Sequence, residues 1–256
     1  MSDLQELLVC CRSVAADPKA QLAAFVDEGK QVVGCLTYFC PEELVYAADM
    51  VPMGIWGANG VQLAEAKRYY PAFICSVLQT TLELGIRGEY DQLTALMVPI
   101  LCDSLKGMGT NWEYGVKTVP VINVAHAQNR KCKAGVTFTA AQYRKISHEL
   151  EQLAGRPITD ADVARGIRIC NENRAALRAF IAAAGKHPEL ISPLDRNAVI
   201  KCGYFMEAPV HTELVRKITR LLEEAPETPW KGLKIVTTGI LADSPELLRI
   251  LEENHI

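Results

Sequence analysis

The chain has 256 residues, of which 49% are hydrophobic and 22% charged, and its formal net charge at pH 7 is −3. This length predicts one large or two small domains with a sizeable apolar core. Lys and Arg are scattered, so nothing favours nucleic-acid binding. No apolar run approaches the roughly 18 residues of a membrane span, and the N-terminus has no signal-peptide core. We therefore expect a cytoplasmic protein that binds neither nucleic acid nor a membrane.

The first half of the chain predicts an alternation of helices and strands. Residues 1–28 have helical spacing of apolar side chains. A helix is expected from Pro41, with Glu42 and Glu43 at its positive end, and another is expected within 67–87, starting near 72–76. Strands are expected over residues 31–38, 50–57, 93–101 and 118–124. This alternation indicates an α/β fold with a Rossmann-like parallel sheet.

The second half predicts a different organisation. Helical signals dominate from 139 to 224, a strand is expected over 233–238, and Ser244 is expected to cap a last helix. We divide the chain into an N-terminal α/β lobe (1–138), a helical region (139–228) and the beginning of a second α/β lobe (229–256). Because one strand and one helix cannot form a stable sheet, this second lobe is expected to be truncated.

Cysteine is the unusual component of the composition. An odd number in a chain without a secretory signal argues against a disulfide framework. The alternatives are buried thiols, metal ligands and catalytic groups. The nine are Cys10, Cys11, Cys35, Cys40, Cys75, Cys102, Cys132, Cys170 and Cys202.

Cys102 follows the apolar run 93–101 directly, so it is expected at the carboxyl edge of the sheet, where open α/β folds bind ligands. Asp103 and Ser104 are expected to cap the helix that follows. The free N–H groups of that helix would favour a thiolate or an anionic cluster. The alternative is a buried cysteine at a strand end.

Cys75 is expected in the first turn of the preceding helix, about one helix-plus-strand unit before Cys102. In a βαβ arrangement both thiols return to one sheet edge, which suggests a soft-metal or iron–sulfur site. The spacing is not a compact ferredoxin or zinc-finger signature.

The other cysteines are less informative. A zinc half-site at Cys35 and Cys40 is not favoured, because the sequence offers no second ligand pair with zinc spacing. Cys132 lies in a basic loop that is expected to be solvated. Cys170 and Cys202 lie in helical stretches and are expected in the core.

Residues 34–52 (GCLTYFCPEELVYAADMVP) resemble a "PEELxxAAGxxP" segment of the 2-hydroxyacyl-CoA dehydratase family, which includes benzoyl-CoA reductase subunits. Asp49 stands where the family usually has glycine. The resemblance continues at Cys75 and at Cys102-Asp103-Ser104, and returns at 238–239 and 245–248.

The resemblance implies a heterodimer of two homologous subunits, each binding a 4Fe-4S cluster through three cysteines. Cys75 and Cys102 match the first two, and the third is not expected in this chain, which could therefore show two ligands without the cluster itself. A separate ATP-dependent iron–sulfur activator protein supplies one electron. The acyl-CoA substrate then loses its hydroxyl group through a ketyl radical anion.

Thr37, near the end of the first strand, is the one catalytic residue that we predict, as a hydrogen-bond donor to the thioester carbonyl. The leading hypothesis is thus a hydro-lyase subunit acting on a 2-hydroxyacyl-CoA. The alternatives are a benzoyl-CoA reductase-type subunit, a non-catalytic partner subunit, and a metal-free binding module whose cysteines lie in the core.

Overall fold

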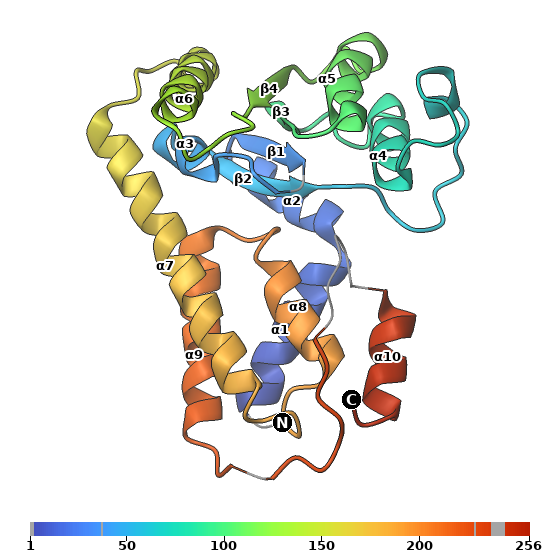
Figure 1. Cartoon of the computed structure of the whole chain (residues 1–256), viewed down its shortest axis with the longest axis vertical. Helices are drawn as coiled ribbons and strands as arrows, with labels where there is room; N and C mark the ends of the chain where they lie inside the picture. The colour runs from blue at the N-terminus through green and yellow to red at the C-terminus, as the bar shows by residue number, and fades with distance from the viewer. Residues whose placement is uncertain (1–2, 37, 228, 237–243) are drawn as a thin grey trace. The chain divides into compact units, whose positions relative to one another are not determined.

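The computed structural model describes residues 3–36, 38–227, 229–236 and 244–256 (Figure 1). The chain forms two compact units, one of residues 22–168 and one of residues 1–21 with 169–256. In the first lie β1 (Val32–Leu36), α3 (Glu42–Ala47), β2 (Val51–Ile55), η1 (Ala66–Arg68), α4 (Ser76–Ile86), β3 (Ala95–Ile100), α5 (Asp103–Gly115), β4 (Val121–Ala125) and α6 (Lys133–Ala154). The second contains α1 (Asp3–Ala16), α8 (Pro193–Cys202), α9 (Ala208–Glu223) and α10 (Pro245–Glu253), while α2 (Pro18–Asp27) and α7 (Asp160–Ala184) cross the boundaries.

The four strands form one parallel sheet in the order β2-β1-β3-β4. This is the order of a doubly wound fold, in which the chain turns outward in opposite directions from β1 and β3. The expected α/β class with a parallel sheet is therefore confirmed. β1 and β2 are buried along their whole length, which is the pattern of a sheet covered on both faces.

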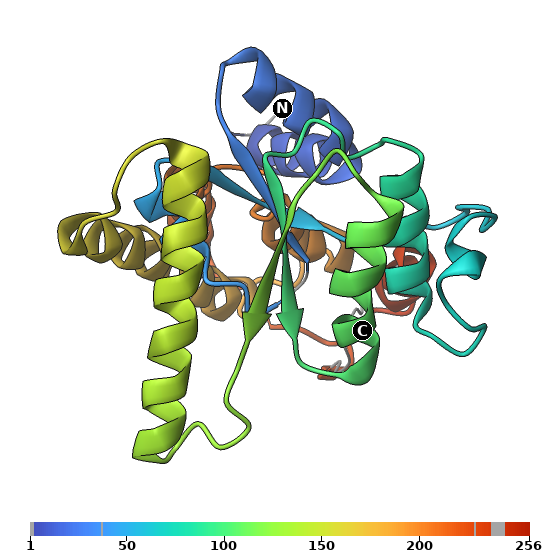
Figure 2. The same ribbon diagram turned by 90° about the horizontal axis from the view of Figure 1, so that it is seen from above.

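Helices cover both faces of the sheet, as Figure 2 shows, with α6 on one side and α4 and α5 on the other. Beneath α3 and α6 lies an apolar cluster that joins them to β1, β3 and β4. Its members include Val45 from α3, Ile146 and Leu150 from α6, and Met97 and Val124 from the sheet. On the other face, the buried Trp112 of α5 donates its indole N–H to the Val119 carbonyl oxygen at 2.9 Å.

Pro99 lies in the central strand β3, where proline is unusual because it cannot donate to the sheet. The register explains why it is tolerated. β3 pairs with β1 only as far as Met97, so among the described strands Pro99 has only β4 as a neighbour, opposite Val124.

The helical unit has its own apolar core. It is formed by residues from α1, the second half of α7, α8 and α9, with Phe180, Val199, Val215 and Ile218 among the fully buried side chains. α9 begins after Glu207 and has the strongly amphipathic sequence expected of a helix that packs on one side.

The compact units divide the chain after residues 21 and 168, whereas the predicted boundaries lie at 138 and 228. Residues 139–154 of α6 pack on the sheet through Ile146 and Leu150, and the first helix of the chain packs with α8 and α9. The division into three domains remains a prediction about how the segments fold.

The predicted strand over 233–238 is wrong for its described part. Residues 233–236 form no strand, and Leu233 and Val236 are 63% and 93% exposed. The Leu233 N–H donates to the His255 carbonyl oxygen at 3.1 Å, but a strand needs a neighbouring strand along its length, and no described strand pairs with this segment. Thr237, Thr238 and Gly239 lie outside the described residues. The cap at Ser244 is confirmed, since its Oγ accepts from the Leu247 N–H at 3.4 Å.

Candidate functional site

The candidate site lies at the carboxyl edge of the sheet. The strands are parallel, so α4 and α5 must run back against them and begin at this edge. The two helices also contact one another along one face of the sheet. The two predicted ligand cysteines, Cys75 and Cys102, stand immediately before these two helices.

Cys102 is the N-cap residue of α5, with extended backbone, and its carbonyl oxygen accepts from the Lys106 N–H at 3.0 Å. Its side chain is exposed. The prediction that Asp103 and Ser104 cap this helix is wrong. Asp103 is already inside the helix, and its fully exposed side chain lies 3.6 Å from the Lys106 ammonium. No side chain within the described part of the chain caps α5, so the thiol stands beside free N–H groups.

Cys75 has the same position on α4. It is the N-cap residue, its side chain is exposed, and its carbonyl oxygen accepts from the N–H groups of Leu78 and Gln79 at 3.0 and 3.2 Å. The Gln79 side chain turns back and donates to the Ile74 carbonyl oxygen at 2.6 Å. This hydrogen bond fixes the turn before the cysteine.

The segment before Cys75 is also attached to α5. The Tyr69 carbonyl oxygen accepts from the Asn111 side chain at 3.2 Å, and the Tyr70 hydroxyl lies 3.3 Å from the Met108 sulfur. Tyr70 and Met108 are 5% and 0% exposed. Helix α5 and the approach to α4 are thus held together by buried contacts.

Tyr70 lies close enough to Cys102 for the two groups to interact electrostatically. Burial, opposed by the Asn111 hydrogen bond and aided by Cys102, raises the pKa of Tyr70 to about 12. The phenol therefore stays protonated at neutral pH and acts as a hydrogen-bond donor.

Glu83 supports the site from within α4. Its carboxylate is 1% exposed, accepts from the N–H groups of Ala64 and Ala66 at 3.0 and 2.8 Å, and pairs with Arg87 at 2.8 Å. Burial alone would raise the pKa of Glu83, but these donors outweigh it and lower the pKa. Neither Glu83 nor Tyr70 was predicted from the sequence. A lone carboxylate in the apolar stretch 82–86 was the available signal.

The remaining cysteines differ in exposure. Cys170 and Cys202 are buried and Cys132 is exposed, as the sequence predicts. Cys11 and Cys35 are also buried. Cys40 lies 3.6 Å from the Met97 carbonyl oxygen, so it packs into the sheet.

Thr37, the predicted catalytic residue, lies outside the described residues. The loop that follows it is held by His126, just after β4, whose Nε2 lies 2.9 Å from the Phe39 carbonyl oxygen. Phe39 has a φ of 70°, an uncommon conformation for a residue other than glycine.

Over the residues that the structure describes, no three His, Cys, Asp or Glu side chains come together as a metal-binding group. Cys75 and Cys102 are thus two ligand candidates without a third. Within the same residues, no helix combines the length and apolarity that crossing a membrane requires.

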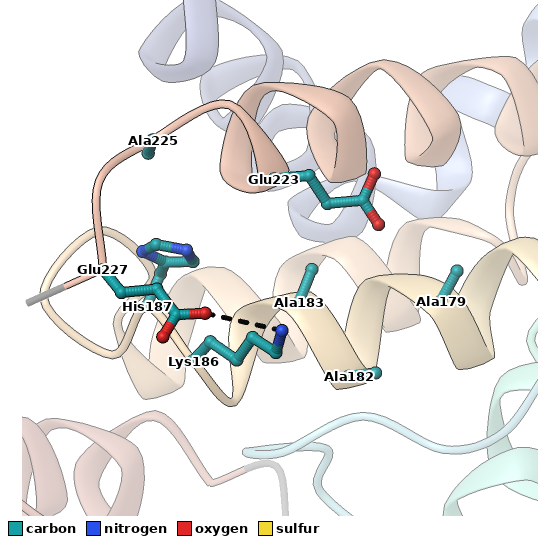
Figure 3. A pocket seen from close by; sticks show the side chains of 8 residues that line it. All are labelled: Ala179, Ala182, Ala183, Lys186, His187, Glu223, Ala225 and Glu227. Atoms are coloured by element: carbon teal, nitrogen blue, oxygen red, sulfur yellow. Dashed lines mark ion pairs between the residues drawn. The ribbon is translucent and has the colours of Figure 1, made fainter.

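A separate pocket of about 360 Å³ lies in the helical unit (Figure 3). Lys186 and Glu227, 3.4 Å apart, pair across its mouth, and both side chains are mostly exposed. His187 is buried and hydrogen-bonded to Glu189 at 3.1 Å. The remaining lining residues are Ala179, Ala182, Ala183, Glu223 and Ala225. A solvated ion pair over alanines offers little to hold an acyl-CoA.

Comparison with known proteins identifies the family. The family model described as 2-hydroxyglutaryl-CoA dehydratase, D-component, matches residues 37–256. The chain belongs to this family. It is 41% identical to the (R)-phenyllactyl-CoA dehydratase beta subunit of Clostridium sporogenes, over 100% of this chain and 68% of the relative. It is 39% identical to the beta subunit of the (R)-2-hydroxyglutaryl-CoA dehydratase of Acidaminococcus fermentans, over 96% and 65%.

A more distant relative is a benzoyl-CoA reductase subunit of Thauera aromatica, 23% identical over 86% of this chain and 58% of that protein. The chain thus spans about two thirds of the length of the dehydratase subunits that it matches. The resemblance to the dehydratase family and the hydro-lyase class are confirmed. The roles of Cys75, Cys102 and Thr37 remain predictions.

Proposed function

We propose that this chain is an iron–sulfur subunit of a 2-hydroxyacyl-CoA dehydratase, with Cys75 and Cys102 as two ligands of a 4Fe-4S cluster. The observation that carries the proposal is the matched position of the two thiols. Each is exposed, each is an N-cap, and their two helices are neighbours at the carboxyl edge of the sheet.

The residues present fit a cluster in two respects. Thiolate sulfurs are the usual ligands of 4Fe-4S clusters, and neither N-cap is closed by a side-chain hydrogen bond of the described residues. The free N–H groups of both first turns would stabilise a net negative cluster and its sulfides. A third ligand is needed beyond these two cysteines, since the described residues offer no group of three.

When bound, the cluster would supply one electron for a ketyl radical anion on the substrate thioester. The overall reaction is the loss of water from a 2-hydroxyacyl-CoA to give a 2-enoyl-CoA, without net oxidation or reduction. The chain's own residues would hold the ligand cysteines in place. Tyr70, which is buried near Cys102 and contacts Met108, would exclude water from one side of the site. Thr37 remains the candidate donor to the thioester carbonyl.

A homologous second subunit and an ATP-dependent activator protein belong to the proposal. The relatives support the presence of a second subunit, since they are named as beta subunits. The proposed compartment is the cytoplasm. A benzoyl-CoA reductase-type subunit is the alternative function, and the much lower identity of that relative favours the dehydratase.

The ligand assignment is tested by measuring iron and acid-labile sulfide in protein that has been purified anaerobically and assembled with its second subunit. We expect Cys75→Ala and Cys102→Ala each to lower the iron content and the sulfide content by the amount that one 4Fe-4S cluster contributes. Cys132→Ala is the matched control, because Cys132 is also an exposed N-cap in the same unit. Equal iron in all four proteins would overturn the ligand assignment.

The substrate class is tested with the same assembly and its activator. Dehydration of 2-hydroxyacyl-CoA thioesters without turnover of benzoyl-CoA is the expected result. Reduction of the aromatic ring would favour the alternative function instead. Full dehydratase activity in Cys75→Ala and Cys102→Ala would show that this chain contributes no catalytic cluster.

A further inference from the structure

Two cysteines from distant parts of the sequence meet inside the helical unit. Cys11 lies in α1 and Cys202 is the last residue of α8, and these two helices pack against each other. Both side chains are 0% exposed and belong to the same apolar core. Their thiols are joined by a side-chain hydrogen bond.

The surroundings distinguish the two sulfurs. The Cys202 thiol donates to the Val199 carbonyl oxygen at 3.3 Å. The contact between the thiols lowers the pKa of Cys11 in spite of burial, while the same contact and burial raise the pKa of Cys202. Cys11 is therefore the better nucleophile and Cys202 remains a thiol.

The charges around the pair come from an ion pair between the same helices. Arg12, next to Cys11 in α1, pairs with Asp195 in the first turn of α8. Asp195 also accepts from the Ser192 hydroxyl at 2.9 Å. These contacts fix α1 against α8, so the two sulfurs are held together by the surrounding structure.

We propose that Cys11 and Cys202 are a site of reversible oxidation, at which a peroxide converts the two thiols into a disulfide that links α1 to α8. The Cys11 thiolate attacks hydrogen peroxide, the O–O bond breaks, and Cys11 becomes a sulfenic acid while hydroxide leaves and is protonated to water. The Cys202 sulfur then attacks the Cys11 sulfur, and the sulfenic hydroxyl leaves with the Cys202 proton as a second water. Two thiols are oxidised by one electron each, and one peroxide is reduced to two waters.

Burial makes this pair different from the exposed thiols. Cys10, adjacent in sequence, is exposed, so peroxide reaches it first, but the sulfur that hydrogen-bonds to Cys202 is that of Cys11. Hydrogen peroxide is little larger than water and enters the pair's site when α1 moves briefly away from α8. Reaction at the pair is therefore expected to be slower than at Cys10, but to end in a disulfide.

Differential alkylation of the full chain tests this proposal without any variant. Protein purified under reducing conditions is exposed to hydrogen peroxide, alkylated under denaturing conditions, digested without reductant and mapped by mass spectrometry. The expected product is one peptide pair joining Cys11 to Cys202, with the loss of two hydrogen atoms, which dithiothreitol separates. The oxidised protein is expected to melt several degrees higher than the reduced protein, because the cross-link restricts the unfolded chain.

Two variants define the specificity. Cys10→Ser is the matched control and should form the same cross-link, whereas Cys202→Ala should form none and show no shift in melting temperature with peroxide. The proposal is overturned if Cys11 and Cys202 are both alkylated after the exposed thiols have been oxidised. It is also overturned if the two are joined only when the protein is unfolded before oxidation.

Discussion

At the scale of single residues, Asp49 departs from the family pattern, and its conformation and ion pairs explain how it is tolerated. It stands where glycine is usual, and its φ of 59° is the left-handed conformation that glycine adopts freely. Asp49 is paired with Arg156 and with Arg165, the latter at 2.6 Å. The ion pairs offset part of the backbone strain, although a carboxylate that is 57% exposed gains little from each.

Replacing Asp49 separates these two effects. Asp49→Ala loses the ion pairs and keeps the strain, so we expect the free energy of unfolding to fall by about 1–2 kcal/mol. Asp49→Gly loses the ion pairs but relieves the strain, and we expect it to be within about 1 kcal/mol of the parent. Urea unfolding measures both. An alanine variant as stable as the glycine variant would contradict the assignment of strain to this position.

His211 links the stability of the helical unit to pH. Its ring is fully buried, Nε2 donates to the Val199 carbonyl oxygen at 2.8 Å, and Nδ1 lies 2.9 Å from the Asn173 amide nitrogen. Burial lowers the pKa of His211 from 6.5 in spite of the hydrogen bond to Val199. The unfolded chain therefore binds the proton more readily than the folded protein.

The neutral, buried His211 contributes its full stabilisation above about pH 6.5. This contribution is lost as the pH falls toward the lowered pKa that His211 has in the folded protein. Between about pH 7.5 and 5.5 it accounts for up to about 1.4 kcal/mol. We expect His211→Gln to reduce the loss of unfolding free energy between these two conditions. His148→Gln, at an exposed position, is the control and should keep the full loss. Equal pH dependence in both variants would exclude His211 as the cause.

At the scale of elements, Glu83 joins α4 to the segment that leads to Cys75. In Glu83→Ala, the N–H groups of Ala64 and Ala66 and the guanidinium of Arg87 lose their acceptor. We expect the free energy of unfolding to fall by about 2–4 kcal/mol and the iron content to fall with it. Chemical unfolding and iron analysis measure the two effects. The exposed pair Glu65–Arg68 supplies the control, and Glu65→Ala should change neither.

The contact between α7 and the α3 helix depends on Gly166. A Cβ atom there would lie 2.1 Å from the Glu43 carbonyl oxygen, a backbone atom that cannot turn aside. We expect Gly166→Ala to destabilise the protein by about 1–3 kcal/mol, measured by urea unfolding. Gly107, inside α5, has only an ordinary contact at 3.6 Å with Tyr70. Gly107→Ala should therefore be neutral or slightly stabilising, and equal losses in the two variants would contradict the explanation.

At the scale of the whole molecule, the sequence predicts most of the sheet unit because local patterns determine it. The apolar run that ends at Ile100 and the proline and acids at the start of α3 correspond directly to β3 and α3. The position of Cys102 at a strand end follows from the same pattern. Residues 233–236 show the limit: their β-branched composition favours a strand, but strand formation depends on a neighbour that no local pattern reveals.

Local sequence patterns also do not predict the contacts that support the candidate site. Tyr70 reaches Met108 and Glu83 reaches Ala64 across long gaps in sequence. Cys11 and Cys202 could be predicted as buried residues but not as neighbours, because helical spacing gives the face of a helix and not its partner. Pairings of this kind need the three-dimensional arrangement.

The helical unit is assembled from residues 1–21 and 169–256, with residues 22–168 between them. During synthesis the sheet unit emerges first and can complete its own core while the ribosome is still translating α8 and α9. Leu8 and Cys11 of α1, fully buried in the structure, then remain uncovered until α8 and α9 have been translated. Helix α1 is therefore synthesised before the sheet unit but packed after it, and its apolar face needs protection until α8 and α9 follow.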